Sequence, residues 1–156
     1  MEFWKASKDI QDLVAELVAK HHPDLALVLD QIVVVFKEKA GTSGGQVVLG
    51  TASKSSALMN ALSGENYQFI LTLGSDQWEN SLTGKQREAL LDSLLCACRA
   101  EEDPKTGDPK CVVARPDIIA FRENLERYGM WFPVEESEKK DLPPVDEIAA
   151  MFGAKQ

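Results

Sequence analysis

The segment at residues 31–37 reads Gln-Ile-Val-Val-Val-Phe-Lys and constrains the fold more than any other part of the chain. Side chains branched at Cβ favour extended backbone, and such an apolar run is typical of a buried strand. Residues 41–45 contain three glycines and predict a flexible turn, while residues 46–51 predict a second strand that forms a hairpin with the first. Residues 67–73 predict a third strand.

Helical segments lie on both sides of these strands in the sequence. Ser7 is a suitable N-cap for a helix over residues 7–20, and Thr83-Gly84-Lys85-Gln86 has the capping-box pattern that opens a helix reaching about residue 100. Shorter helices are expected at residues 55–62, 116–127 and 145–152, and a short extended piece at residues 110–114. This order predicts an α+β fold in which helices pack against one small sheet.

The length of 156 residues suits one domain with a real core, which we assign to residues 1–133. Residues 134–156 are expected to form an acidic linker and the short C-terminal helix. The 17 basic and 25 acidic residues give a net charge of −8, which argues against a general grip on nucleic-acid phosphates. No apolar run approaches the roughly 20 residues of a membrane span, and no secretory signal begins the chain, so we expect a cytoplasmic protein.

The three cysteines, Cys96, Cys98 and Cys111, fit reduced thiols better than a disulfide framework. Cys96 and Cys98 are two residues apart, and on a helix they would point in different directions. A metal held by these thiols together with Asp92 or Asp117 is the less favoured alternative to buried thiols that pack like small apolar groups. His21 and His22 close the first helix, where a histidine complements the negative end of the helix dipole.

The residues from Gln86 to Cys98 read Gln-Arg-Glu-Ala-Leu-Leu-Asp-Ser-Leu-Leu-Cys-Ala-Cys. This segment resembles the core helix of a phage metallopeptidase family, in which Arg-x-Ala-Leu-Leu-Asp leads into His-Glu-Leu-Cys-His-Cys. Its flanks agree with the family as well, and the resemblance extends from about residue 9 to residue 131: the agreeing segments are residues 48–50, Trp78, residues 101–103 and residues 127–131. The resemblance implies a zincin-like fold, with the small sheet packed against this core helix and flanking helices.

The chemistry of such a family depends on His-Glu-x-x-His, because two histidines one helical turn apart reach one zinc ion and the glutamate activates its water. The matching positions here are Ser93, Leu94 and Ala97. On the next helix the resemblance places a liganding histidine at Pro116 and an acidic pair at Ile119 and Ala120. It therefore implies a member without zinc ligands, without a catalytic glutamate and without a metal cofactor.

A fold that is kept without its chemistry is expected to act through its surface. The leading hypothesis is a catalytically inactive phage or prophage protein that binds a host or phage protein with a basic surface, as an inhibitor of a host defence system such as a CRISPR or restriction nuclease. Direct binding to nucleic acid or membrane is not expected. Candidate partner-binding residues are the exposed acids Glu101, Glu102, Asp103, Glu135, Glu136 and Glu138. The alternative is a metal-dependent hydrolase or peptidase with non-standard ligands.

Overall fold

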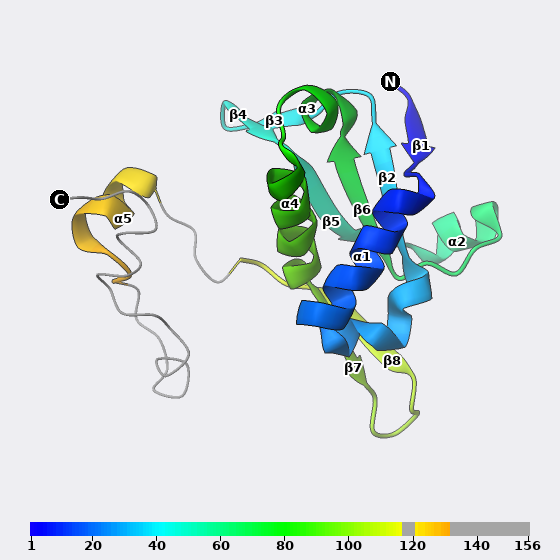
Figure 1. Ribbon diagram of the computed structural model, residues 1–156. Coiled ribbons are helices and arrows are strands. Elements are labelled where there is room, and N and C mark those ends of the chain that lie inside the picture. The colour runs from blue at the N-terminus through cyan, green and yellow to red at the C-terminus, as the bar shows by residue number, and fades with distance from the viewer. Residues whose placement is uncertain (117–120, 132–156) are drawn as a thin grey trace. The chain divides into compact units, whose positions relative to one another are not determined.

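The computed structural model describes residues 1–116 and 121–131 of the chain. The chain divides into two compact units, Met1–Arg115 and Pro116–Gln156. The first unit combines helices with mixed strands, which confirms the predicted α+β class (Figure 1). Among the described residues no helix is both long and apolar enough to cross a lipid bilayer.

The main sheet has four strands in the order β1-β2-β6-β5. Its central pair, β2 and β6, is parallel, whereas each outer strand pairs antiparallel with its neighbour. The strands are β1 (Phe3–Lys5), β2 (Ile32–Lys37), β6 (Phe69–Gly74) and β5 (Gly50–Lys54). The β-branched run at residues 31–37 therefore lies inside the sheet, as its composition predicts.

The prediction of a hairpin between residues 31–37 and 46–51 is wrong. Gly44 and Gly45 adopt positive φ angles of 58° and 81°, which close a tight hairpin between β3 (Gly41–Ser43) and β4 (Gln46–Val48). The chain then continues into β5, which pairs with β6, so that the strongly apolar β6 becomes the neighbour of β2. Pairing these two apolar strands at the centre of the sheet buries more apolar surface than the predicted hairpin would.

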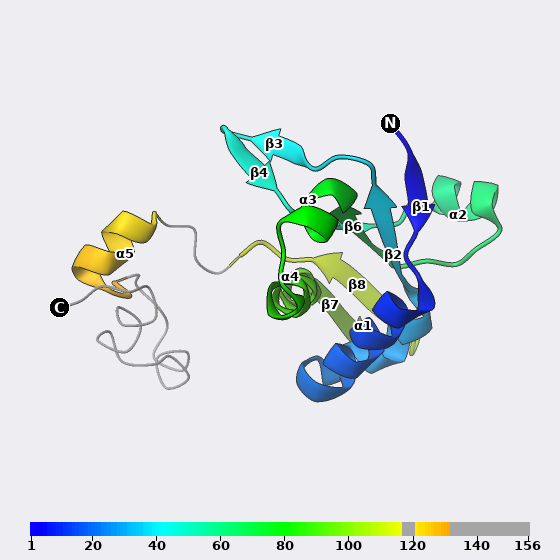
Figure 2. The same ribbon diagram turned by 45° about the horizontal axis from the view of Figure 1, so that its top comes forward.

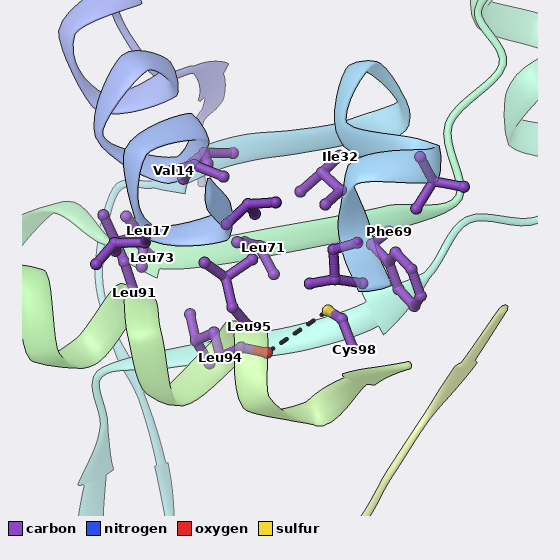
Figure 3. Close-up of a cluster of buried hydrophobic side chains, with 14 of the residues drawn as sticks. Val14, Leu17, Ile32, Phe69, Leu71, Leu73, Leu91, Leu94, Leu95 and Cys98 are labelled. Carbon is purple, nitrogen blue, oxygen red and sulfur yellow. Dashed lines mark hydrogen bonds between the residues drawn. The ribbon is translucent and has the colours of Figure 1, made fainter. Parts of the chain in front are cut away.

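One face of the sheet carries the core. Along β6 the side chains alternate, since Phe69, Leu71 and Leu73 are fully buried while Ile70 and Thr72 are partly exposed. The helices α1 (Lys8–His21) and α4 (Gly84–Ala97) cover the buried face (Figures 1 and 2). Figure 3 shows the resulting cluster, in which leucines of both helices meet the sheet. Full burial of each such side chain contributes about 1.5–3 kcal/mol.

Several helix ends agree with the sequence patterns. Ser7 occupies the N-cap position of α1, and α2 (Ala57–Ser63) is the predicted short helix, ending at Gly64 with a left-handed φ of 74°. In the second unit α5 (Arg122–Tyr128) ends close to the predicted residue 127, but it begins later than the predicted residue 116. Residues 117–120 and the predicted linker and final helix at residues 135–152 lie outside the described residues. The chain also forms elements that the patterns did not predict: β1, the 3-10 segment η1 (Pro23–Gln31) and α3 (Ser75–Asn80).

The helix predicted to reach about residue 100 ends earlier. α4 stops at Ala97, and β7 (Cys98–Glu102) pairs antiparallel with β8 (Pro109–Val113). In this pairing Cys98 and Ala100 point to one side and are buried, as is Cys111 opposite Ala100. The ladder of backbone hydrogen bonds and the burial of alternate residues therefore override the helical propensity of the segment.

Asp76 joins the start of α3 to the connection after β2. Its Oδ1 accepts hydrogen bonds from the backbone amides of Ala40 (2.8 Å) and Gln77 (2.9 Å). The Ala40 amide is the main reason why the pKa of Asp76 lies below its usual value. Gly74 and Ala40 lie very close to each other, because a Cβ added to Gly74 would lie 2.5 Å from the Cβ of Ala40.

Asp76→Asn should lower Tm near neutral pH. A lowered folded-state pKa means that the ionised carboxylate stabilises the fold above the unfolded-state pKa, and that this stabilisation is lost as pH falls through the folded value. The difference in Tm from wild type should therefore shrink as pH falls below about 3.9, the ordinary pKa of an aspartate. The exposed Asp12→Asn is the matched control and should show no such pH dependence. A deficit that stays constant across the pH range would show that the charge of Asp76 does not matter.

Candidate functional site

The helix α4 is fixed at its start by a complete capping box. The backbone amide of Gln86 donates to the Thr83 hydroxyl (3.2 Å), and the backbone amide of Thr83 donates to Gln86 Oε1 (2.9 Å). One residue further on, Arg87 donates from Nε to the Trp78 carbonyl (3.0 Å), and its guanidinium lies 5.3 Å from the centre of the indole ring. These contacts fix the start of α4 and tie it to Trp78 of α3.

The inward face of α4 is apolar throughout. Leu91, Leu94 and Leu95 are buried and point toward β6 (Figure 3). Leu94 also packs against β5, since a Cβ added to Gly50 would lie 3.1 Å from Leu94 Cδ1 and 3.1 Å from Leu73 Cδ2. Glycine at position 50 thus allows the helix and the strand to approach closely, and Leu94 fills the space between them.

Ser93 and Ala97 lie one helical turn apart on a different side of α4. Ser93 is exposed, and Ala97 is half-buried. The Ala97 carbonyl accepts a hydrogen bond from the backbone amide of Ala114 (2.7 Å), which places the end of β8 at the end of the helix. Pro116 is exposed and belongs to the second unit, whereas Ser93, Leu94 and Ala97 belong to the first. Ile119 and Ala120 lie outside the described residues.

A cluster of ionisable side chains lies where the end of α1 meets α4. His22 Nε2 is 2.7 Å from Asp92 Oδ1, and Cys96 Sγ is 4.0 Å from Asp92 Oδ2. The sequence pattern favoured a helix-dipole role for His22 over a metal role, and the pairing of His22 with Asp92 was missed. The available signal was the spacing of Asp92 and Cys96, since residues four apart share one face of a helix.

The other two thiols are packed into the protein. All three cysteines are thiols, and Cys98 and Cys111 are buried. Burial raises the pKa of Cys98 to about 12 and also raises the pKa of Cys111. The Cys98 thiol donates to the Leu94 carbonyl (3.5 Å), a contact drawn in Figure 3. Both side chains therefore stay protonated and act as small apolar groups, whereas Cys96 is exposed.

Three of the acidic residues expected to bind a partner, Glu101, Glu102 and Asp103, lie at the tip of the hairpin β7–β8. Glu101 and Glu102 are exposed, but Glu101 is paired in register with Lys110 on the opposite strand. Asp103 has a role in the turn, because its Oδ1 accepts from the backbone amide of Lys105 (2.8 Å). The hairpin therefore presents mixed charge. Glu135, Glu136 and Glu138 lie outside the described residues.

The chain matches a known protein family over most of its length. Residues 2–148 match the family described as "Putative phage metallopeptidase". The chain belongs to this family. The match covers nearly the whole chain and confirms the resemblance noted in the sequence. No curated protein and no solved structure gives a significant match.

Membership of a metallopeptidase family implies a metal at its active site, so the residues at the expected positions can be tested for their fit. A serine hydroxyl is a poor zinc ligand, and Ala97 has no donor atom. Leu94 is 8% exposed and lies in the apolar cluster, and its hydrocarbon side chain cannot accept a proton. Ser93, Leu94 and Ala97 therefore do not fit a zinc ion held in the His-Glu-x-x-His manner.

Proposed function

We propose that this member of the phage metallopeptidase family is catalytically inactive as a peptidase and acts as a protein-binding module. The observation that carries the proposal is the packing of Leu94. At the position where a peptidase of this type needs a general base in contact with solvent and substrate, the chain has a leucine that fills the gap between α4 and β5. A buried side chain at this position contributes to stability and leaves no room for a reacting water.

The surface of α2 supports the binding role. This helix contains no buried residue, and it exposes Leu58 by 69%, Met59 by 46% and Leu62 by 80%. Leu58 and Leu62 are four residues apart and share one side of the helix. With Ser56 and Ser63 these three side chains line an open depression of about 450 Å³. Contiguous apolar surface that is left exposed on a small protein is typical of a contact site for another protein.

The proposed partner is a host or phage protein that receives the apolar side of α2 in a hydrophobic groove. The net charge of −8 favours a partner whose surrounding surface is basic, because complementary charge speeds association. A nuclease of a host defence system, such as a CRISPR or restriction enzyme, has the basic surface that this requires. Inhibition of such an enzyme by direct contact, without contact to its nucleic acid, is the role we propose.

A second candidate function is a hydrolase with non-standard metal ligands. The short distances between the His22, Asp92 and Cys96 side chains favour this second function, because imidazole, carboxylate and thiolate are donor types that zinc accepts. The two candidates differ in a simple respect: the hydrolase needs metal-dependent turnover, and the binding module does not.

A hydrolysis assay separates them. The protein, purified with and without added Zn²⁺, should not cleave a fluorescently labelled unfolded protein above background, and a chelator should make no difference. Asp92→Asn and Cys96→Ala variants purified in the same way control for contaminating proteases. Turnover that depends on metal and disappears in these variants would contradict the proposal and establish the hydrolase.

A further inference from the structure

Three possible metal ligands from two helices converge beside the end of α1. A ring nitrogen of His22, a carboxylate oxygen of Asp92 and the Sγ of Cys96 all lie within 4.8 Å of one another. Asp92 is central, with one oxygen 2.7 Å from His22 Nε2 and the other 4.0 Å from Cys96 Sγ. None of these residues occupies a position of the His-Glu-x-x-His pattern.

Local structure holds the three side chains in place. Asp92 and Cys96 are one turn apart on α4, and they point to the same side of the helix. His22 is the C-cap of α1, where its backbone amide donates to the Val18 carbonyl (3.0 Å) and its own carbonyl accepts from the amide of Leu25 (3.0 Å). The histidine is thus anchored on both sides of its backbone, independently of its contact with Asp92.

The cluster lies at the protein surface but is partly shielded from water. The side chain of His22 is 12% exposed and that of Asp92 is 37% exposed. Here Asp92 and the exposed Cys96 leave an entry path, while the imidazole is already nearly removed from solvent.

Imidazole, carboxylate and thiolate are the donor types that zinc prefers. A tetrahedral zinc ion with ligand bonds of roughly 2.0–2.3 Å holds its donor atoms about 3.3–3.8 Å apart. The contact between His22 and Asp92 would lengthen slightly and that between Asp92 and Cys96 would shorten slightly to reach this spacing. Rotation of the exposed Cys96 side chain and of the partly exposed Asp92 carboxylate would make both changes and would bring together the ligand atoms, which now lie within 4.8 Å of one another.

We propose that His22, Asp92 and Cys96 bind one zinc-type divalent ion, with water as the fourth ligand. On binding, Cys96 releases its thiol proton to solvent, and neutral His22 coordinates through Nε2 with its proton on Nδ1. The ion links the end of α1 to α4 and stabilises their packing. This proposal does not depend on the proposed function, because it concerns metal content and stability rather than turnover or partner capture.

The test uses the full chain, reduced and stripped of metal with a chelator. Adding ZnCl₂ should give one bound zinc ion per chain and raise Tm by roughly 5–10 °C at about a hundredfold excess over Kd, while MgCl₂ should do neither. His22→Asn, Asp92→Asn and Cys96→Ala should each weaken zinc binding by more than the roughly 10–100-fold that the loss of an outer partner costs. His21→Asn removes the exposed neighbouring imidazole and should leave zinc affinity unchanged.

Two further readouts distinguish ligation from a general effect on folding. Zinc should protect Cys96 from alkylation in the native protein, and Co²⁺ should give a thiolate-to-cobalt absorption band that is lost in Cys96→Ala. The proposal is overturned if zinc neither raises Tm nor protects Cys96, or if zinc affinity survives all three ligand substitutions. In that case the contact between His22 and Asp92 is a hydrogen-bonded link between two helices and nothing more.

Discussion

Leu94→Glu should unfold most of the protein at 25 °C, although it places a carboxylate at the position that the resemblance matches to the glutamate of a peptidase. The side chain at this position is 8% exposed and lies against Gly50 and Leu73. Truncation to alanine should already cost about 2–5 kcal/mol, as for other large-to-small changes in a core. A carboxylate there adds the cost of burying a charge without a partner, and the sum takes up much of a total stability of roughly 5–15 kcal/mol.

Chemical denaturation followed by circular dichroism measures these effects. Ser93→Glu is the matched control, because it introduces the same side chain one residue earlier at an exposed position, and its stability should stay close to that of the wild type. If Leu94→Glu instead folds with an unchanged denaturation midpoint, position 94 faces a cleft open to solvent. The packing account of α4 would then be wrong.

Features that depend on neighbouring residues could be predicted from the sequence. The capping box at Thr83 and Gln86, the short helix α2 and the β-branched strand β2 all formed where their patterns placed them. Each of these is determined within a few residues of chain, so propensity and capping decide the outcome. The family match at residues 2–148 confirms the resemblance carried by the segment from Gln86 to Cys98.

Features that depend on residues far apart in the chain could not be predicted from the sequence. The parallel pairing of β2 with β6 crosses β3, β4, β5 and α2 in sequence, and nothing local distinguishes it from the predicted hairpin. The end of α4 at Ala97 depends on β8, because only the ladder with residues 109–113 makes an extended backbone better than another helical turn. His22 and Asp92 are 70 residues apart, so their contact follows from how α1 packs against α4.

The fold changes the expectation that the exposed acidic residues of the β7–β8 hairpin bind the partner. Asp103 contributes to the turn of the hairpin, and Glu101 has a lysine opposite it. Reversal of Asp103 should therefore disturb the hairpin, which makes Glu101 and Glu102 the cleaner positions for charge reversal. The exposed leucines of α2 remain as the stronger candidates for contact, because apolar anchors contribute more binding energy than charges at a rim.

Loss of partner capture by the α2 variant Leu58→Asp/Leu62→Asp is the second large effect that we expect. Both side chains are highly exposed and α2 buries none of its residues, so the double substitution should leave Tm nearly unchanged. In a complex the same two leucines would be buried in the groove of the partner, and charging them should weaken binding by at least about tenfold. Leu27→Asp is the matched control, since Leu27 is a leucine of η1 that is 57% exposed.

Quantitative capture of host proteins by the wild type, the α2 variant and the Leu27→Asp control tests the binding role most directly, with the oligomeric state and Tm of each protein recorded. We expect one partner that the wild type and the control retain and that the α2 variant loses, with all three proteins folded and of equal size. Capture that is unchanged in the α2 variant would contradict the account. A dimer that the wild type forms and the α2 variant does not form would also contradict it. The apolar side of α2 would then bind a second copy of the chain.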